Sequence, residues 1–302
     1  MDTPGNPPDP ALGRPTSMIS RRSAADPADP LAWLTSPCVM GVVNVTPDSF
    51  SDGGDHLAAH AAGASVARLA ADGAAIVDLG AESTRPGAER VSADQQLRRL
   101  RPVLDALAAV PPGVALSIDT TRAAVAEVAL DHGALLVNDV SAGRDDPDLL
   151  GLVADRGVGL CLMHMRGQPR DMQQAPSYDD VVGEVCGFLE RRLAAAVAAG
   201  VPEARVLLDP GIGFGKTLEH NLALLAGLPR VRALGRPVVV GASRKGMVGL
   251  LTHRPVEGRM AGSLGAALAA VHGGADVVRV HDVAETVDAL RVWRAVRERA
   301  DA

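Results

Sequence analysis

The stretch RVLLDPGIGFGKT, residues 205–217, joins a short apolar run to a glycine-rich turn. Its glycines suggest a phosphate-binding loop, but neither known spacing fits. A P-loop requires glycine at position 210, where this chain has proline, and the glycines at 211–215 alternate as G-x-G-x-G rather than G-x-G-x-x-G. A flexible strand-to-helix connection would explain the glycines alone. Asp209, at the end of the apolar run, indicates more, because polar residues end the other apolar runs in the same way.

Short apolar runs alternate with longer amphipathic segments from Cys38 onward. Nearly continuous apolar character is typical of parallel strands covered on both faces. We expect strands at 38–44, 74–80, 114–120, 134–139, 158–164, 205–210, 237–243 and 275–281. Strand–helix alternation over about 250 residues, without a break between domains, predicts an α/β fold with a single (β/α)8 TIM barrel. A doubly wound open sheet is the second possibility.

The composition excludes several classes of protein. A net charge of -6 without a long basic run argues against nucleic-acid binding, and no apolar stretch reaches the roughly 18 residues of a membrane span. With 47% hydrophobic but only 2% aromatic residues, the core must be aliphatic. The three cysteines lack metal-ligand spacing and fit a reducing cytoplasm. Residues 1–30 are rich in Pro, Asp and Ala, lack a signal peptide, and are expected to form a disordered tail.

Polar residues end nearly every predicted strand. One such residue is an ordinary cap or turn former, but a ring of them needs another explanation. The carboxyl ends of barrel strands meet at one face, where active sites of this fold lie. The pattern therefore predicts an active site there, with these strand-end residues: Asn44, Asp78 with Glu82, Asp119, Asn138 with Asp139, His164, Asp209, Ser243 to Lys245, and Arg279 with His281.

Several long motifs resemble the dihydropteroate synthase family, in the family's order: MGVVNVTPDSFSDGG (40–54), VDLGAESTRPGA (77–88), SIDTTR (117–122), NDVSAG (138–143), MHMRGQP (163–169), LDPGIGFGK (208–216), VGASRKG (240–246) and RVHDV (279–283). The resemblance implies one pterin-binding (β/α)8 domain over residues 37–295. It implies condensation of 6-hydroxymethyl-7,8-dihydropterin pyrophosphate with p-aminobenzoate, release of pyrophosphate, use of Mg2+, and a homodimer. We expect the subunit interface on the helices that follow strands six to eight, including the segment 262–274.

The resemblance also assigns residues to the pterin. Its amino-pyrimidinone edge alternates donors and acceptors, which carboxylates and an amide on rigid strand ends can read. The residues implied for the pterin are Asp119, Asn138, Val140, Met163, Asp209, Gly213 and Lys245. Among these, Met163 supplies an apolar, polarizable wall, and Val140 packs on the ring. Helix capping is the alternative role for the two aspartates, and core filling is the alternative for Met163.

The remaining assignments concern the diphosphate and the aryl amine. For the diphosphate the resemblance implies Asn44, Thr84, Arg279 and His281, with Asn44 as the metal ligand, and for catalysis Arg279, His281, Thr84, Arg85 and Lys245. A structural histidine is the alternative for His281. For p-aminobenzoate it implies Phe50, Pro86, Phe214, Ser243 and Arg244. The loops 44–55 and 82–90 are expected to be mobile lids.

Two other functions remain open at this point. One is a pterin-binding paralogue without synthase activity, which should show damage in the lids or in the R-x-H motif of residues 279–281; none is visible. The other is methyl transfer from a folate to a corrinoid, which would not need that motif and both lids. For the synthase we hypothesise that pyrophosphate leaves early and that the aryl amine then attacks a cation-like carbon. An aryl amine is nearly neutral at about pH 7 and needs no strong general base, and the sequence offers no obvious candidate for one.

Overall fold

The computed structural model describes residues 31, 34, 37–45, 54–85, 87–107 and 113–300, with the backbone alone for 54–60. The predictions for the tail 1–30, Phe50 and Pro86 lie outside these residues. In the described part of the chain, a single sheet contains eight strands: β1 (Cys38–Asn44), β2 (Ile76–Gly80), β3 (Ala115–Asp119), β4 (Leu136–Asp139), β5 (Gly159–Met163), β6 (Val206–Asp209), β7 (Val239–Val240) and β8 (Val277–Val280).

All paired strands are parallel, in the order β6-β5-β4-β3-β2-β1-β8-β7. The two ends of this order meet through a parallel bridge between Leu208 and Val238, and the amide of Leu208 donates to the carbonyl of Pro237 at 2.9 Å. This bridge closes the sheet into a cylinder. The (β/α)8 barrel is confirmed, and the doubly wound open sheet is wrong.

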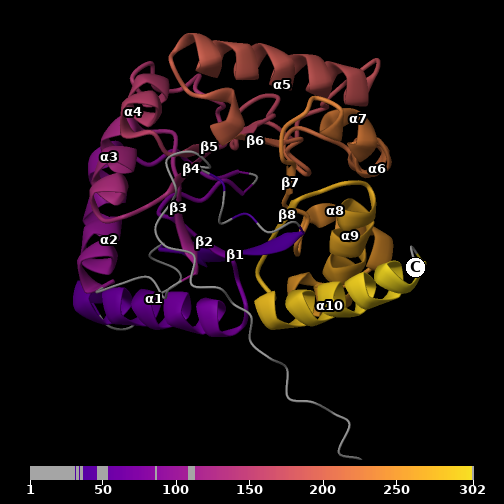
Figure 1. The fold of residues 1–302 in the computed structure, drawn as a ribbon, viewed down its shortest axis with the longest axis horizontal. Helices are drawn as coiled ribbons and strands as arrows, with labels where there is room; N and C mark the ends of the chain where they lie inside the picture. Colours follow the sequence, from indigo (N-terminus) through magenta and orange to yellow (C-terminus); the bar gives the residue numbers. More distant parts are fainter. Residues whose placement is uncertain are drawn as a thin grey trace, which may run out of the picture.

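Helices surround the strands on the outside (Figure 1). Their bounds are α1 (Gly54–Ala71), α2 (Ala93–Ala106), α3 (Ala123–Asp131), α4 (Leu149–Arg156), α5 (Val181–Ala198), α6 (Leu218–Ala226), α7 (Leu228–Arg232), α8 (Gly246–Thr252), α9 (Met260–His272) and α10 (Val283–Ala300). The carboxyl ends of the strands form the mouth of the barrel, and a helix cap fixes one of the loops there. Thr217 and His220 form a capping box that begins α6 directly after the glycine turn.

Inside the barrel, side chains from neighbouring strands lie in layers, because every second residue of each strand faces inward. Each of the eight strands contributes to one buried apolar cluster, which includes Cys38, Met40, Ile76, Ala115, Leu136, Cys161, Leu207, Val239 and Val277. Residues two positions further along also face inward, because side chains alternate along a strand. These residues are largely polar and include Asp78, Ser117, Asn138, Asp209 and Arg279. The barrel thus has an apolar floor and a polar upper half.

Strand β7 is shorter than the predicted run 237–243. Val239–Val240 pairs with β8 and Val238 bridges to β6, whereas the residues after Val240 turn toward α8. Arg244 adopts a left-handed backbone with φ of 57°, which no strand continues through. The apolar character of the run reflects burial in the turn as well as pairing in the sheet.

Candidate active site

Asp78 on β2 is the centre of a buried polar network. Its side chain is fully buried and accepts three hydrogen bonds. Ser117 Oγ donates to Oδ1 at 2.6 Å, and Asn138 Nδ2 donates to Oδ2 at 3.0 Å. Arg279 Nε donates to Oδ2 at 2.8 Å. These bonds join β2, β3, β4 and β8 across the inside of the barrel and fix the Asn138 amide.

Arg279 is held between two carboxylates. Its Nη2 donates to Asp119 Oδ2 at 2.9 Å, while its Nε is bound to Asp78. Burial alone would lower the pKa of Arg279, but Asp78 and Asp119 outweigh it and raise that pKa, so the guanidinium stays charged. Burial raises the pKa of Asp119 to about 7; Arg279 opposes this rise and Asp78 adds to it. Asp119 can therefore gain or lose a proton near neutral pH.

Asp209 and Lys245 are a second pair of charged groups, within electrostatic range of each other on the opposite side of the mouth from β2. Asp209 is 6% exposed and accepts a hydrogen bond from the Gly211 amide at 2.7 Å. Burial raises the pKa of Asp209, opposed first by Lys245. The Lys245 Nζ donates to the carbonyl of Ile212 and lies 4.4 Å from the ring centre of Phe214. Burial lowers its pKa to about 8, opposed by Asp209.

The glycines of the 211–215 turn are explained by close backbone contact. All three have positive φ, at 69°, 84° and 64°. A Cβ on Gly211 would lie 1.9 Å from the carbonyl oxygen of His164, and one on Gly215 would lie 2.2 Å from that of Arg166. The turn therefore packs directly on the segment after β5, which places Asp209 and Phe214 beside the mouth.

The buried side chain of Lys216 holds this turn in place through hydrogen bonds. It is 3% exposed, and its Nζ lies 2.9 Å from Nδ1 of His164. The same nitrogen donates to the carbonyls of Gly211 at 2.8 Å and Phe214 at 3.0 Å. Burial lowers the pKa of His164 to about 2, and Lys216 adds to this effect, so His164 is neutral. A neutral Nδ1 can accept the hydrogen bond of Lys216.

An apolar wall lines the mouth between these charged groups. Val140, Met163, Met165 and Met172 form a buried cluster, and the partly buried Phe214 packs against it. Both residues predicted to contact the pterin ring without hydrogen bonds, Val140 and Met163, belong to this cluster. The mouth thus offers an apolar face beside polar edges, as a flat heteroaromatic ring requires.

His281 and Ser243 are paired across β8 and the turn after β7. Ser243 Oγ lies 3.1 Å from Nδ1 of His281 and accepts the His281 amide at 3.2 Å. Burial lowers the pKa of His281 to about 4, reinforced by Arg244 and Arg279. The side chain of Arg244 is engaged elsewhere, since its Nε donates to Asp282 at 3.1 Å. Ser243 and Arg244 are both predicted for the p-aminobenzoate site. Ser243 contacts His281, whereas the guanidinium of Arg244 faces Asp282.

The loop after β2 brings Thr84 and Arg85 to the rim. Thr84 is half-buried and Arg85 is exposed. Glu82 secures the base of the loop by accepting the amide of Val91 at 3.1 Å and Nε2 of Gln96 at 2.9 Å. The charge of Arg85 contributes to the lowered pKa of His281, which places the two side chains within electrostatic range.

Asn44 ends β1 and is half-buried at the mouth. Within the described residues, no group of three or more His, Cys, Asp and Glu side chains could hold a metal ion. The Asn44 amide oxygen is a hard donor of the kind that Mg2+ accepts, but a single protein ligand fits only a cation held mostly by substrate oxygens and water. Among the described residues, no helix combines the length and hydrophobicity that crossing a bilayer requires.

Two side chains in this arrangement had no assigned role in the sequence prediction. The sequence pattern predicts Asp78 only as a strand-end residue at the active-site face, and Lys216 only as part of a glycine-rich turn. The alternation of β2 was an available signal: Ile76, Asp78 and Gly80 share the inner face of the strand. For Lys216 the sequence held no signal, because its partner His164 lies 52 residues away.

Comparison with known proteins identifies the family. The family model described as "Pterin binding enzyme" matches residues 40–281. The dihydropteroate synthase of Neisseria meningitidis serogroup C is 47% identical over 267 residues, which cover 87% of this chain and 94% of the relative. A structure of Xanthomonas albilineans dihydropteroate synthase with 4-aminobenzoic acid matches with a TM-score of 0.81 and 52% identity, covering 87% of this chain and 94% of that one. Another, in complex with 7,8-dihydropteroate, matches with a TM-score of 0.78 and 49% identity, covering 87% and 95%. The chain belongs to the family of pterin-binding enzymes, among the dihydropteroate synthases.

Proposed function

We propose that the mouth of this barrel joins 6-hydroxymethyl-7,8-dihydropterin pyrophosphate to p-aminobenzoate, forming 7,8-dihydropteroate and pyrophosphate. The observation that carries the proposal is the polar upper half of the barrel, where Asp119, Asn138 and Asp209 surround an apolar wall beside Arg279. The relatives support it, since the Xanthomonas albilineans synthase has structures with 4-aminobenzoic acid and with 7,8-dihydropteroate.

The pterin binds in the slot between the two charged pairs. Asp209 and Asp119 accept from its amino and ring N–H groups, and Asn138, fixed by Asp78, completes the edge. Lys245 donates from the opposite side. Gly213 leaves room for that side chain, because a Cβ there would lie 3.0 Å from Cδ of Lys245. Val140 and Met163 cover a face of the ring.

The diphosphate lies over Arg279 and His281. The Arg279 side chain remains 23% exposed while bound to Asp78 and Asp119, so its guanidinium also faces the mouth. Phosphate oxygens suit this planar donor set. His281 is neutral in the free protein and becomes a stronger donor by gaining a proton when the anion arrives. Thr84 and Arg85 close over the diphosphate from the loop after β2.

Mg2+ would be held by Asn44 and the diphosphate itself. When bound, it would neutralise charge on the diphosphate as that group leaves. The protein's own contribution is to position the amide oxygen at the end of β1, next to β8 with Arg279.

The aryl amine packs against Phe214 and has its carboxylate near Ser243 and the backbone around Arg244. Phe50 and Pro86, outside the described residues, complete this slot. The carbonyl of Phe214 is bound by Lys216, which holds the ring in place. The Arg244 side chain is held by Asp282, its amide donates to Ser263 Oγ at 2.9 Å, and its carbonyl accepts from Arg259 Nη1 at 3.0 Å. The carboxylate therefore lies beside the Ser243 hydroxyl rather than on the Arg244 guanidinium.

The chemical step is a dissociative substitution. The C–O bond between the pterin methylene and the diphosphate breaks first, with its electron pair leaving on the diphosphate. The amine nitrogen then attacks the cation-like carbon and loses a proton to solvent. Positional isotope exchange within the diphosphate, measured without productive amine attack, is expected; its absence while the diphosphate rotates freely contradicts this order of events.

The test of the function is direct. The protein is incubated with the dihydropterin pyrophosphate, labelled p-aminobenzoate and Mg2+, and labelled dihydropteroate and pyrophosphate are expected in equal amounts. Pterin binding without product would favour the non-catalytic paralogue. Methyl transfer from methyltetrahydrofolate to a corrinoid, without dihydropteroate, would favour the methyltransferase.

We take residues 37–295 as the catalytic domain, in the cytoplasm, acting as a homodimer. Large exposed hydrophobic side chains beside the expected interface segment 262–274 support the dimer: Leu250, Leu251, Val256 and Met260 are 61%, 51%, 45% and 40% exposed. Leu250→Asp should shift the sedimentation coefficient toward the monomer, and an unchanged dimer would exclude this surface.

A further inference from the structure

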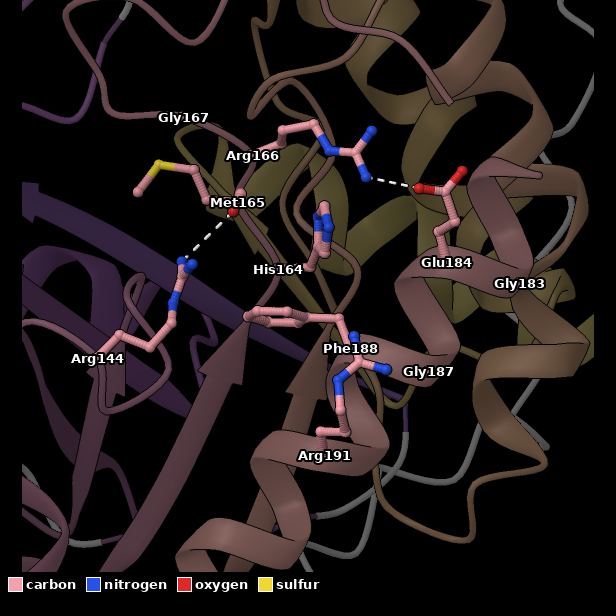
Figure 2. A pocket seen from close by; sticks show the side chains of 10 residues that line it. All are labelled: Arg144, His164, Met165, Arg166, Gly167, Gly183, Glu184, Gly187, Phe188 and Arg191. Atoms are coloured by element: carbon pink, nitrogen blue, oxygen red, sulfur yellow. Dashed lines mark hydrogen bonds and ion pairs between the residues drawn. The ribbon is translucent and has the colours of Figure 1, made fainter. Parts of the chain in front are cut away.

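A cavity lies outside the barrel mouth, between α5 and the loops that follow β4 and β5. It has a volume of about 400 Å3, and its lining includes three arginines, Arg144, Arg166 and Arg191, and one glutamate, Glu184. Figure 2 shows the arginines reaching this cavity from three sides around Phe188. None of the residues assigned to the pterin or to the aryl amine lines this cavity.

The charge of the cavity is strongly positive in a chain whose net charge is -6. Arg166 is neutralised by Glu184, with Nη2 and Oε2 2.6 Å apart. The remaining two arginines have no carboxylate partner among the described residues, which leaves two positive charges facing one space. That charge matches a dianion such as a phosphate monoester.

The guanidinium of Arg144 is fixed by contacts within the protein. Its Nε donates to the carbonyl of Ser141 at 2.7 Å, and its Nη2 donates to that of Met165 at 3.4 Å. Its guanidinium carbon lies 4.9 Å from the ring centre of Phe188. Arg144 is exposed, but these contacts fix its guanidinium, which therefore loses little conformational entropy when an anion binds.

Arg191 and Gly187 lie one turn apart on the face of α5 that borders the cavity. A Cβ at Gly187 would meet only the Nη1 of Arg191, at 3.4 Å. Glycine in the middle of a helix is destabilising, and here its effect is to keep the space beside Phe188 open. The half-buried Phe188 lines the cavity with Arg144 over its ring and His164 packed edge-on, with ring centres 4.9 Å apart, and the rest of the ring offers apolar surface for a planar group.

From this geometry we propose that the cavity is a second ligand site, for a phosphate monoester carried on a planar aromatic ring. The phosphate lies between Arg144 and Arg191, and the ring packs beside Phe188 over Gly187. His164, on the cavity wall, is hydrogen-bonded to Lys216, so the site adjoins the anchor of the aryl-amine turn.

The experiment titrates the full-length protein with phenyl phosphate, followed by calorimetry. Because the barrel mouth also takes phosphates, variants assign the binding. Arg191→Gln is expected to weaken the cavity-site Kd about tenfold or more, the loss of one charge-assisted contact. Gly187→Leu fills the cavity, favours the helix, and should abolish that binding while the protein stays folded. Arg98→Gln, an exposed arginine on α2, is the matched control and should bind as the wild type does.

Two further probes test the ligand class. Cyclohexyl phosphate, without an aromatic ring, and benzoate, with a single charge, should each bind more weakly than phenyl phosphate. Phenyl phosphate binding that is absent, or unchanged in both Arg191→Gln and Gly187→Leu, overturns the site. Equal binding of cyclohexyl phosphate or benzoate overturns the proposed ligand.

Discussion

Arg279 Nε lies 2.8 Å from Asp78 Oδ2, although the two residues are 201 positions apart in sequence. Asp78 is fully buried and has no direct access to a ligand at the mouth. Its carboxylate nevertheless fixes both Asn138 and Arg279, which the proposed function places on the pterin and on the diphosphate. Asp78 thus fixes the positions of Asn138 and Arg279 relative to each other, and with them the proposed sites for the pterin and for the diphosphate of one substrate.

Asp78→Asn should therefore damage stability and turnover together. The amide N–H groups of the new asparagine would face the N–H groups of Arg279 or Asn138, so a hydrogen bond is lost. The substitution also removes a negative charge that balances the buried Arg279 guanidinium. We expect the free energy of unfolding to fall by about 3 kcal/mol, as for other broken buried ion pairs. Urea unfolding measures this. Ser117→Ala removes one neutral donor from the same carboxylate and should cost only about 1 kcal/mol; equal losses would show that the charge is unimportant.

The raised pKa of Asp119 should make stability depend on pH. Its pKa rises from 3.8 in the unfolded chain to about 7 in the folded protein, mainly by burial. A raised pKa means that the folded state holds the proton more tightly, so this contribution to stability is present below the unfolded pKa and is lost as pH rises through about 7. Asp119→Asn removes that dependence.

The measurement compares urea unfolding of wild type and Asp119→Asn at about pH 5 and about pH 8. From the lower to the higher pH, the wild type should lose stability relative to the variant. A difference that stays constant across this interval contradicts the raised pKa.

Lys216 should act on the aryl amine rather than on the chemical step. Lys216→Met leaves the carbonyls of Gly211 and Phe214 without their donor and frees the turn that carries Phe214. We expect the KM for p-aminobenzoate to rise about tenfold, equivalent to the net worth of one or two hydrogen bonds. Initial-rate kinetics in both substrates check this. If kcat falls while both KM values stay unchanged, Lys216 does not position the aryl slot.

Arg85 should matter more for turnover than for pterin binding. It is exposed at the rim, yet close enough to influence the pKa of His281. Arg85→Ala should lower kcat about a hundredfold if it stabilises the departing charge, while the Kd for a pterin without diphosphate stays near the wild-type value. Pre-steady-state rates and calorimetry separate the two. An equal loss of both refutes the lid role, and Arg98→Gln serves as a control for the loss of a surface charge.

The sequence predicted the barrel well because its signals are local. Every predicted strand is present, since a continuous apolar run such as 205–210 needs no knowledge of its neighbours to indicate a buried parallel strand. The strand-end residues Asn138, Asp209 and Arg279 share one mouth because parallel strands place all their carboxyl ends on one side. Family motifs added the chemical roles, which the pattern alone did not contain.

What the sequence could not predict depends on contacts between distant segments. The side chain of Arg244 belongs to the same predicted aryl site as Ser243, but it turns to Asp282, 38 residues later. Because the backbone at Arg244 is left-handed, the side chains of Ser243 and Arg244 point in different directions. Lys216 is likewise defined by His164 on another strand end. Such pairings follow from how loops pack at the mouth, and no periodicity records them.

His281 should take up a proton when the diphosphate binds. Its pKa in the free protein is lowered to about 4 by burial and by Arg244 and Arg279, so it is neutral at about pH 6. A bound polyanion reverses the local charge and raises that pKa, because an opposite charge favours the protonated form. Calorimetric titration with pyrophosphate in two buffers of different ionisation enthalpy measures the protons exchanged. His281→Gln should bind with less proton uptake than the wild type, and the proton exchange of pyrophosphate itself cancels in this comparison. His132→Gln, at an exposed histidine that follows α3, should match the wild type; identical uptake in all three proteins would remove His281 from the diphosphate site.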